Sequence, residues 1–253
     1  MDVLEALGLA SAAFVAGAVN AVAGGGSLIS FPALLAFGYP AKTANVTNTV
    51  ALWPGYAGGS FAYRYELRDQ VRRVAFLLPP AVLGALAGSA LLLSTSGDAF
   101  EDIVPFLILL GAVLMLFQER LALIAAGRKL TSRGGDHVPV TLQAGVFLGA
   151  IYGAYFGAGL GVILLAFLTI LLPDNIQSSN ALKGALSLVI NAVAVVYFAL
   201  FGPVEWLPAA AMAIGAVAGG YAGGRVAQQL PAMVFRWAVV VFGVCVAVVL
   251  LVT

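Results

Sequence analysis

The chain has 253 residues, of which 62% are hydrophobic and 9% are charged, and its formal net charge is +1. Soluble domains carry about a quarter charged residues, so this composition excludes a water-soluble globule and predicts a protein immersed in lipid. The near-neutral charge also argues against a nucleic-acid partner. One cysteine and one histidine exclude an intramolecular disulfide and a metal site built from His and Cys ligands.

Ten apolar stretches follow one another along the chain, and six of them are long enough, or nearly so, to cross a bilayer. A crossing takes about 20 helical residues, and helices are expected because backbone polar groups must be satisfied within lipid. The second and seventh stretches are short and follow glycine-rich breaks, which favours half-helices or re-entrant segments. The stretches are 5–23, 27–38, 44–63, 71–93, 100–117, 141–156, 160–172, 178–201, 206–227 and 232–252.

A polar connection at 118–140 divides the chain near its midpoint, and three matches recur in the same order on both sides of it. Phe14–Ser27 matches Phe147–Leu160, Asn45 matches Asn180, and L-G-A-L-A-G at 83–88 matches I-G-A-V-A-G at 214–219. We therefore predict an internal repeat. Its parts are an N-terminal repeat at 1–117, a linker loop at 118–140 and a C-terminal repeat at 141–253.

The distribution of charge predicts the orientation in the membrane. Basic residues cluster at 64–73 and within 118–140, which places both segments in the cytoplasm by the positive-inside rule. The loop between them carries Asp98, Glu101 and Asp102 without a basic residue, so it is expected outside. The N-terminus is acidic and is also expected outside, although one continuous broken span over the first two stretches would place it inside. With the N-terminus outside, the halves are inverted relative to each other, as in many secondary transporters.

The strongest local signal for a binding site is the glycine break between Asn20 and Ser27. Consecutive glycines stop a helix, at about 1 kcal/mol each relative to alanine, and allow a ligand to approach the backbone. The next half-helix then directs its positive dipole end and unpaired amides at the break, which favours an anion. The break at Gly157–Gly161 repeats this pattern, so both half-helix N-termini are expected at a shared point near the midplane. Tight packing of small residues is the alternative. The candidates are Asn20, Gly24, Gly25, Gly26, Ser27, Gly157, Ala158 and Gly159.

Polar residues open the stretches that begin near 44 and 178. Asn45, Asn48, Asn180 and Lys183 could supply neutral donors and one cation to the same anion. Helix capping is the alternative for the polar residues, and snorkelling to the interface is the alternative for Lys183. Tyr152 and Tyr155 lie near the second break. For both side chains, packing in the core is favoured over lining a transport pathway.

Chemistry beyond binding is not expected. All eleven acidic residues map to loops or to the ends of apolar stretches, which argues against an intramembrane carboxylate relay. No base, nucleophile or metal-ligand set converges, so we expect neither an enzyme nor a cofactor or metal.

These motifs resemble the sulfite exporter TauE/SafE family of membrane permeases. The resemblance rests on G-x-x-N-A-V-A-G-G-G-S-L-I-S-F-P at 17–32, on T-A-N-V-T-N at 43–48 and on a weaker second copy from Gly149, and it extends over essentially the whole chain. It implies export of small anions, such as sulfite, thiosulfate or organosulfonates, across the plasma membrane. In the second copy Asn20 aligns with Gly153 and Ser27 with Leu160, so a symmetric ligand shell is not expected.

We therefore expect an all-α polytopic membrane protein with two inverted repeats, each combining a glycine-broken half-helix or re-entrant segment with about three spanning helices. Its expected partners are a small anionic substrate and the lipid bilayer, and the sequence leaves a homo-oligomer open. It would carry the anion by alternating access at a midplane site. An anion channel-like pore of the same fold and a non-transporting membrane scaffold are the alternatives.

Overall fold

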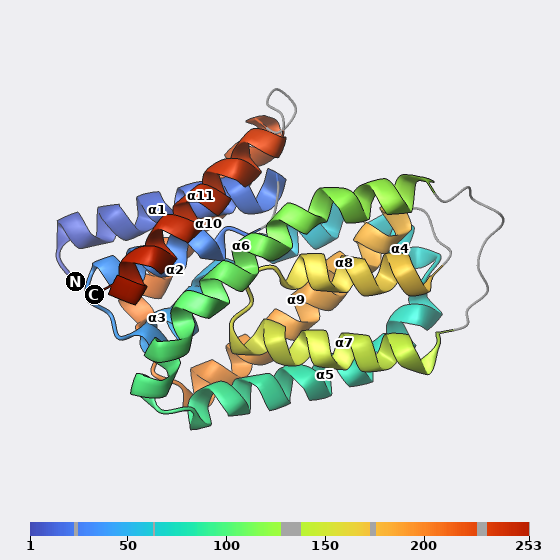
Figure 1. Ribbon diagram of the computed structural model, residues 1–253, viewed down its shortest axis with the longest axis horizontal. Coiled ribbons are helices and arrows are strands. Elements are labelled where there is room, and N and C mark those ends of the chain that lie inside the picture. The colour runs from blue at the N-terminus through green and yellow to red at the C-terminus, as the bar shows by residue number, and fades with distance from the viewer. Residues whose placement is uncertain (23–24, 63, 128–137, 173–175, 227–231, 253) are drawn as a thin grey trace.

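The computed structural model describes residues 1–22, 25–62, 64–127, 138–172, 176–226 and 232–252 (Figure 1). Within these ranges the only regular secondary structure is α-helix, which confirms the expected all-α class. The helices are α1 (Val3–Val22), α2 (Ser27–Ala36), α3 (Ala41–Ala62), α4 (Arg64–Arg68), α5 (Val71–Ser94), α6 (Gly97–Gly127), α7 (Val140–Tyr155), α8 (Leu160–Leu171), α9 (Ile176–Phe201), α10 (Trp206–Val226) and α11 (Ala232–Val252).

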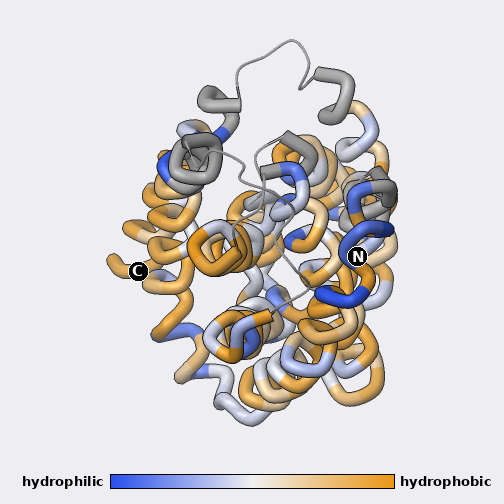
Figure 2. The backbone as a smooth tube through the Cα atoms, turned by 90° about the vertical axis from the view of Figure 1, so that its right-hand side faces the viewer, coloured by the Kyte–Doolittle hydropathy of each residue, from blue (hydrophilic) through white to orange (hydrophobic). Residues whose placement is uncertain are grey.

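Four helices of the described residues are long and apolar enough to cross a membrane, and shorter apolar helices accompany them. The outward faces of the bundle are apolar as well. Ile214 of α10 is 74% exposed and Val249 of α11 is 58% exposed, which is unfavourable in water but natural against lipid. Figure 2 shows hydrophobic residues along most of the helical length.

The two short helices α2 and α8 are each too short to cross a membrane. With 10 and 12 residues they extend about 15 and about 18 Å, against a hydrocarbon core of about 30 Å. Each returns alongside the helix before it. In the α7–α8 hairpin, Gly145 faces Phe167 and Gly153 faces Leu160. α1 and α2 pack together in the same way, so each pair is a hairpin closed at a glycine break.

The most extensive helix contacts join the two halves of the chain. α1 packs along α10, and α7 packs along α5 (Figure 1). α3 also contacts α10, α9 also contacts α5, and α3 and α9 contact each other. The two halves are therefore interlocked, because the first helix of each half packs against a late helix of the other.

The matched hexapeptides 83–88 and 214–219 form these inter-half contacts. A Cβ atom on either glycine of each hexapeptide would collide with backbone carbonyl groups of the facing helix, so only glycine permits this approach. For these four glycines, close packing of helices is the observed role. The contacts are Gly84 with Phe147, Gly88 with Ile151, Gly215 with Ala10 and Gly219 with Phe14.

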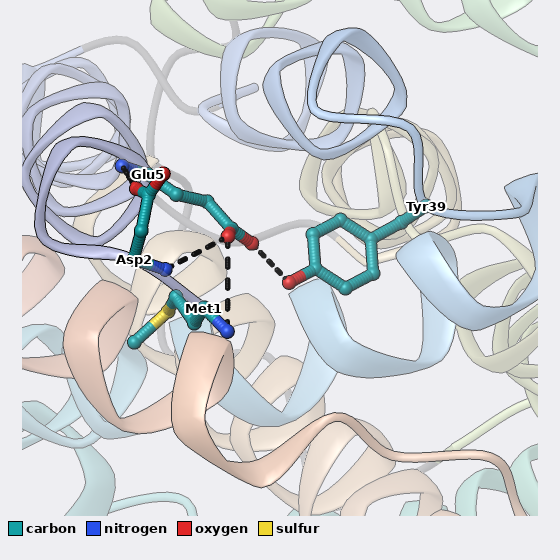
Figure 3. A network of polar contacts seen from close by, with 4 residues as sticks. All are labelled: Met1, Asp2, Glu5 and Tyr39. Carbon is teal, nitrogen blue, oxygen red and sulfur yellow. Dashed lines mark hydrogen bonds and ion pairs between the residues drawn. The ribbon is translucent and has the colours of Figure 1, made fainter.

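One end of the bundle holds Asp2 and Glu5 at the start of the chain and the acidic residues at the start of α6, and we call it the acidic end. Both termini and the α5–α6 connection lie there, and the residues that flank 128–137 lie at the opposite end (Figure 1). Glu5 accepts a hydrogen bond from the Tyr39 hydroxyl, which ties the start of α1 to the loop after α2 (Figure 3). Glu101 of α6 lies 3.5 Å from the backbone nitrogen of Ala41, at the start of α3.

α6 is longer than its apolar stretch. It continues to Gly127, so residues 118–127, which we assigned to the linker loop, are helical. The physical reason is that Gln118, Glu119 and Arg120 are good helix formers and lead directly into the leucine- and alanine-rich segment 121–126. The rest of the predicted polar connection, up to residue 137, lies outside the described residues.

Candidate functional site

A single turn of α6 contacts both glycine breaks. The side chains and backbone of this turn pack against Gly25 in the first break and against Ala158 and Gly159 in the second. The structure therefore places both breaks against the same turn of α6, while a shared point at the membrane midplane stays a prediction. The contacts are Met115 with Gly25, Gly111 with Ala158 and with Leu28 of α2, and Leu114 with Gly159. The rings of Phe31 and Phe156 add a direct contact between α2 and the second break, with centroids 5.5 Å apart.

The first break is held by the side chain of Asn20. Gly25 has a φ of +82°, a conformation that glycine adopts without strain. The Asn20 Oδ1 atom accepts a hydrogen bond of 2.7 Å from the backbone amide of Gly26. Asn20 and Gly26 were both predicted to contact the ligand, and the structure shows them bonded to each other. Gly24 lies outside the described residues.

A buried polar chain continues from the first break to α3. The Ser30 Oγ atom lies 2.5 Å from Oδ1 of Asn48 and 3.3 Å from the carbonyl oxygen of Gly26. Asn48 is 2% exposed, and its Nδ2 group has no acceptor among the described residues. Ser30 was missed in the sequence, although its place one turn after Ser27 puts both on the same face of α2.

The second break is held by a different side chain. Gly157 and Gly159 have φ values of +83° and +82°, and Gly159 is the N-terminal cap of α8. The Tyr152 hydroxyl donates a hydrogen bond of 2.5 Å to the carbonyl oxygen of Ala158. The amides of Ala158 and Gly159 have no acceptor among the described residues. This role of Tyr152 was not predicted, because a bond across a turn depends on side-chain direction.

Asn45 joins the two halves at the second break. Its Nδ2 group donates a hydrogen bond of 2.8 Å to the carbonyl oxygen of Tyr155, the last residue of α7. Asn45 is 1% exposed. Its amide therefore satisfies a helix-terminal carbonyl that would otherwise be unpaired inside the bundle.

Lys183 lies beside the N-terminal turn of α8. Its Nζ atom donates a hydrogen bond of 3.0 Å to Oδ1 of Asn180, one turn earlier in α9. Its aliphatic chain passes Gly161, where an added Cβ atom would lie 3.6 Å from Cδ of Lys183. No carboxylate of the described residues forms an ion pair with Lys183. A cation at the positive end of a helix dipole is unfavourable by itself and becomes favourable with an anion between them.

The candidate residues fall into two groups. Asn20, Gly26 and Asn45 form bonds that hold the breaks and the halves together. Each residue of the second group keeps at least one N–H or O–H donor without an acceptor among the described residues; the group is Ser27, Asn48, Ala158, Gly159, Asn180 and Lys183. The described residues contain no group of His, Cys, Asp and Glu side chains that could hold a metal ion. The arrangement is therefore suited to binding an anion through neutral amides and one ammonium group.

Two helices broken by glycine, held together within a bundle of apolar helices, are typical of a multi-pass membrane transporter. The family model of the sulfite exporter TauE/SafE matches residues 9–250. The chain belongs to this family of membrane transporters.

Several curated proteins are similar to the chain over most of their length. A probable membrane transporter protein of Haemophilus influenzae is 28% identical over 228 residues, which cover 90% of this chain and 87% of that protein. The probable membrane transporter protein ORF9 of a Sinorhizobium species is 28% identical over 95% of this chain and 90% of its own. The probable membrane transporter protein YfcA of Escherichia coli is 28% identical over a region that covers 84% of this chain and 77% of that protein. No solved structure gives a significant match.

Proposed function

We propose that the protein exports small anions across the plasma membrane, with sulfite or a related sulfur oxyanion or organosulfonate as the substrate. The observation that carries this proposal is the position of Lys183 beside the N-terminus of α8, without a carboxylate partner among the described residues. The family adds support, because its description names a sulfite exporter. Sulfite and sulfonates present a compact set of oxygens that amides and an ammonium group can bind.

In the proposed site the anion lies between the second break and α9. The amides of Ala158 and Gly159, the Lys183 ammonium and Asn180 contact its oxygens, while Asn48 and Ser27 complete the shell from the first half. Asn20, Gly26 and Asn45 do not contact the anion in this proposal. Their hydrogen bonds hold the backbone of the two breaks in place. Gly25 and Gly157, both with positive φ, allow the chain to turn tightly at the two breaks, and Gly24 remains a sequence-based candidate.

Transport is proposed to proceed by alternating access, with the two halves as inverted repeats that rock around the site. The packing between the halves supports the repeat, because the contact of α1 with α10 has a counterpart in the contact of α7 with α5. The proposed orientation places the N-terminus outside and the linker loop in the cytoplasm. The location of both termini at the end opposite to the residues that flank 128–137 supports this orientation (Figure 1).

The test replaces Lys183 by Gln, which keeps the hydrogen-bonding stem and removes the charge. We expect Lys183→Gln to abolish the stabilisation of purified protein by sulfite and to abolish sulfite flux into proteoliposomes, and Lys183→Arg to retain part of both. Lys42→Gln is the matched control. The Lys42 ammonium donates hydrogen bonds of 2.7 Å to the carbonyl oxygens of Leu93 and Thr95, so its loss weakens the fold and leaves anion stabilisation intact.

Sulfite stabilisation and flux that persist in Lys183→Gln would show that the site is elsewhere. The concentration dependence of flux separates the mechanisms, because a carrier saturates and a channel-like pore gives linear flux. A non-transporting scaffold would show neither flux nor stabilisation with sulfite, thiosulfate, sulfonates or sulfate.

A further inference from the structure

Tyr155, the last residue of α7, makes its side-chain contacts with the N-terminal half. Its ring packs edge-on against Phe100 of α6, with centroids 5.7 Å apart. Its hydroxyl lies 3.3 Å from Oγ1 of Thr95, at the end of α5. Thr95 Oγ1 donates its single proton to the carbonyl of Leu91 at 2.8 Å, so the Tyr155 hydroxyl is the donor of the bond to Thr95.

The backbone around Tyr155 is tied to the same half. The Tyr155 carbonyl accepts the hydrogen bond from Asn45 of α3. The next residue, Phe156, packs its ring on Phe31 of α2. Immediately before the second break, therefore, two aromatic residues of the C-terminal half are wedged between four helices of the N-terminal half.

These contacts lie between the second break and the acidic end. Thr95 and Phe100 flank the α5–α6 connection, which lies at that end (Figure 1). Phe100 is fully buried. The Lys42 ammonium fixes the last carbonyls of α5 from the start of α3. A ligand leaving the second break toward the acidic end would therefore meet the Tyr155 ring first.

The two halves differ at this position. In the match of Phe14–Ser27 with Phe147–Leu160, the counterparts of Tyr155 and Phe156 are Val22 and Ala23. The aromatic pair thus occurs in only one copy of the repeat.

We propose that Tyr155, together with Thr95 and Phe100, is the gate that closes the anion site toward the acidic end. This inference rests on the proposed transport function and identifies the contacts that must break when the site opens to that face. One hydrogen bond and one ring contact can separate reversibly, and the bond from Asn45 holds the backbone of the gate in place.

The test measures how fast a cysteine in the site reacts from the acidic end. Ser27→Cys, at the half-buried start of α2, is the reporter in a Cys245→Ser background, and a membrane-impermeant methanethiosulfonate bearing a sulfonate group is the reagent. Asp98→Cys in a separate protein marks the acidic end in oriented vesicles. The parent reporter is expected to be protected from that face. Tyr155→Ala should speed its labelling from that face about ten- to a hundredfold, and Tyr155→Phe by no more than about tenfold.

Tyr197→Ala is the matched control, because the Tyr197 ring packs on Phe198 and Phe201 of its own helix. It should leave the labelling rate unchanged. Tyr155→Leu, which keeps apolar volume, replaces Tyr155→Ala if that protein does not fold. Parental rates in the Tyr155 variants, or a parent labelled as fast as the Asp98→Cys marker, would overturn the gate. Labelling needs no substrate, and sulfite flux is measured in protein that keeps Ser27, because Ser27 belongs to the proposed ligand shell. Absent flux in that protein together with accelerated labelling of the reporter contradicts only the proposed function.

Discussion

Tyr39 is the residue at which the acidic end responds to pH. Its hydroxyl donates a hydrogen bond to the Glu5 carboxylate, which also lies 4.0 Å from the N-terminal amine (Figure 3). Burial, followed by the hydrogen bond and charge of Glu5 and a smaller contribution from Glu205, raises the pKa of Tyr39 to about 12. The folded protein therefore favours the protonated phenol.

Because the folded pKa of Tyr39 exceeds its ordinary value of about 10, its contribution to stability is complete below pH 10 and is lost between about pH 10 and 12. We expect the melting temperature of the native protein to fall over this interval more steeply than that of Tyr39→Phe. The variant should also be less stable near pH 7, by about 1 kcal/mol, because one hydrogen bond is lost. Parallel melting curves from pH 9 to 12 would show that the contact contributes nothing.

At the scale of helices, the packing of α1 on α10 depends on individual glycines. A Cβ atom at Gly219 would collide with the backbone of Phe14, whereas at the adjacent Gly220 the nearest atom would lie 3.9 Å away. We therefore expect Gly219→Ala to destabilise the protein by about 1–3 kcal/mol through overpacking. Gly220→Ala should leave stability unchanged or raise it by up to about 1 kcal/mol, since alanine favours a helix.

The difference in stability between Gly219→Ala and Gly220→Ala is measured by thermal unfolding in the same detergent. The comparison is matched, because each variant adds a single methyl group to the same helix. Equal stability of Gly219→Ala and Gly220→Ala would mean that α1 and α10 are not packed as closely as described. Gly88→Ala extends the test to α5 and α7, where a Cβ atom would collide with the backbone of Ile151.

The helices themselves could be predicted from the sequence, and their pairing could not. Hydrophobicity and the two glycine breaks identified every long helix, because a helix is a local consequence of composition in lipid. The contact of Gly219 with Phe14 joins residues far apart in the chain, and nothing local encodes it. The matched hexapeptides were therefore interpreted as a sign of repetition only, while in the structure they are the contact surfaces between the halves.

The candidate site shows the same division. The break glycines and Lys183 could be identified because glycine runs and an embedded charge are rare in apolar helices. The bonds from Tyr152 to Ala158 and from Ser30 to Asn48 could not, since they depend on which way each side chain points after the chain turns. Asn20 was placed at the break correctly, and its bond to Gly26 makes it a support of the backbone in this structure.

At the scale of the whole molecule, charge and fold agree on two unlike ends. The start of α1, the start of α3 and the start of α6 meet at the acidic end, where Glu5 contacts Tyr39 and Glu101 lies near Ala41. The basic residues at 64–73 lie in α4 and in the first turn of α5, and Arg120 lies in the last turns of α6. The residues that flank 128–137 lie at the opposite end from both termini (Figure 1). In a membrane, basic connections remain in the cytoplasm, so the acidic end is expected outside.

This orientation predicts that both termini face outward and that the linker loop faces the cytoplasm. Single cysteines at Asp2, Asp98 and Thr253, each in a Cys245→Ser background, should react with an impermeant maleimide in intact cells, and a cysteine at Ser132 should react only after the membrane is opened. If the protein inserts the other way, the labelling of all four positions must reverse together: the cysteine at Ser132 would react in intact cells and the other three would not. Labelling of Asp2 and Thr253 from opposite sides would contradict the inverted repeat itself, because each half would then not make an odd number of crossings.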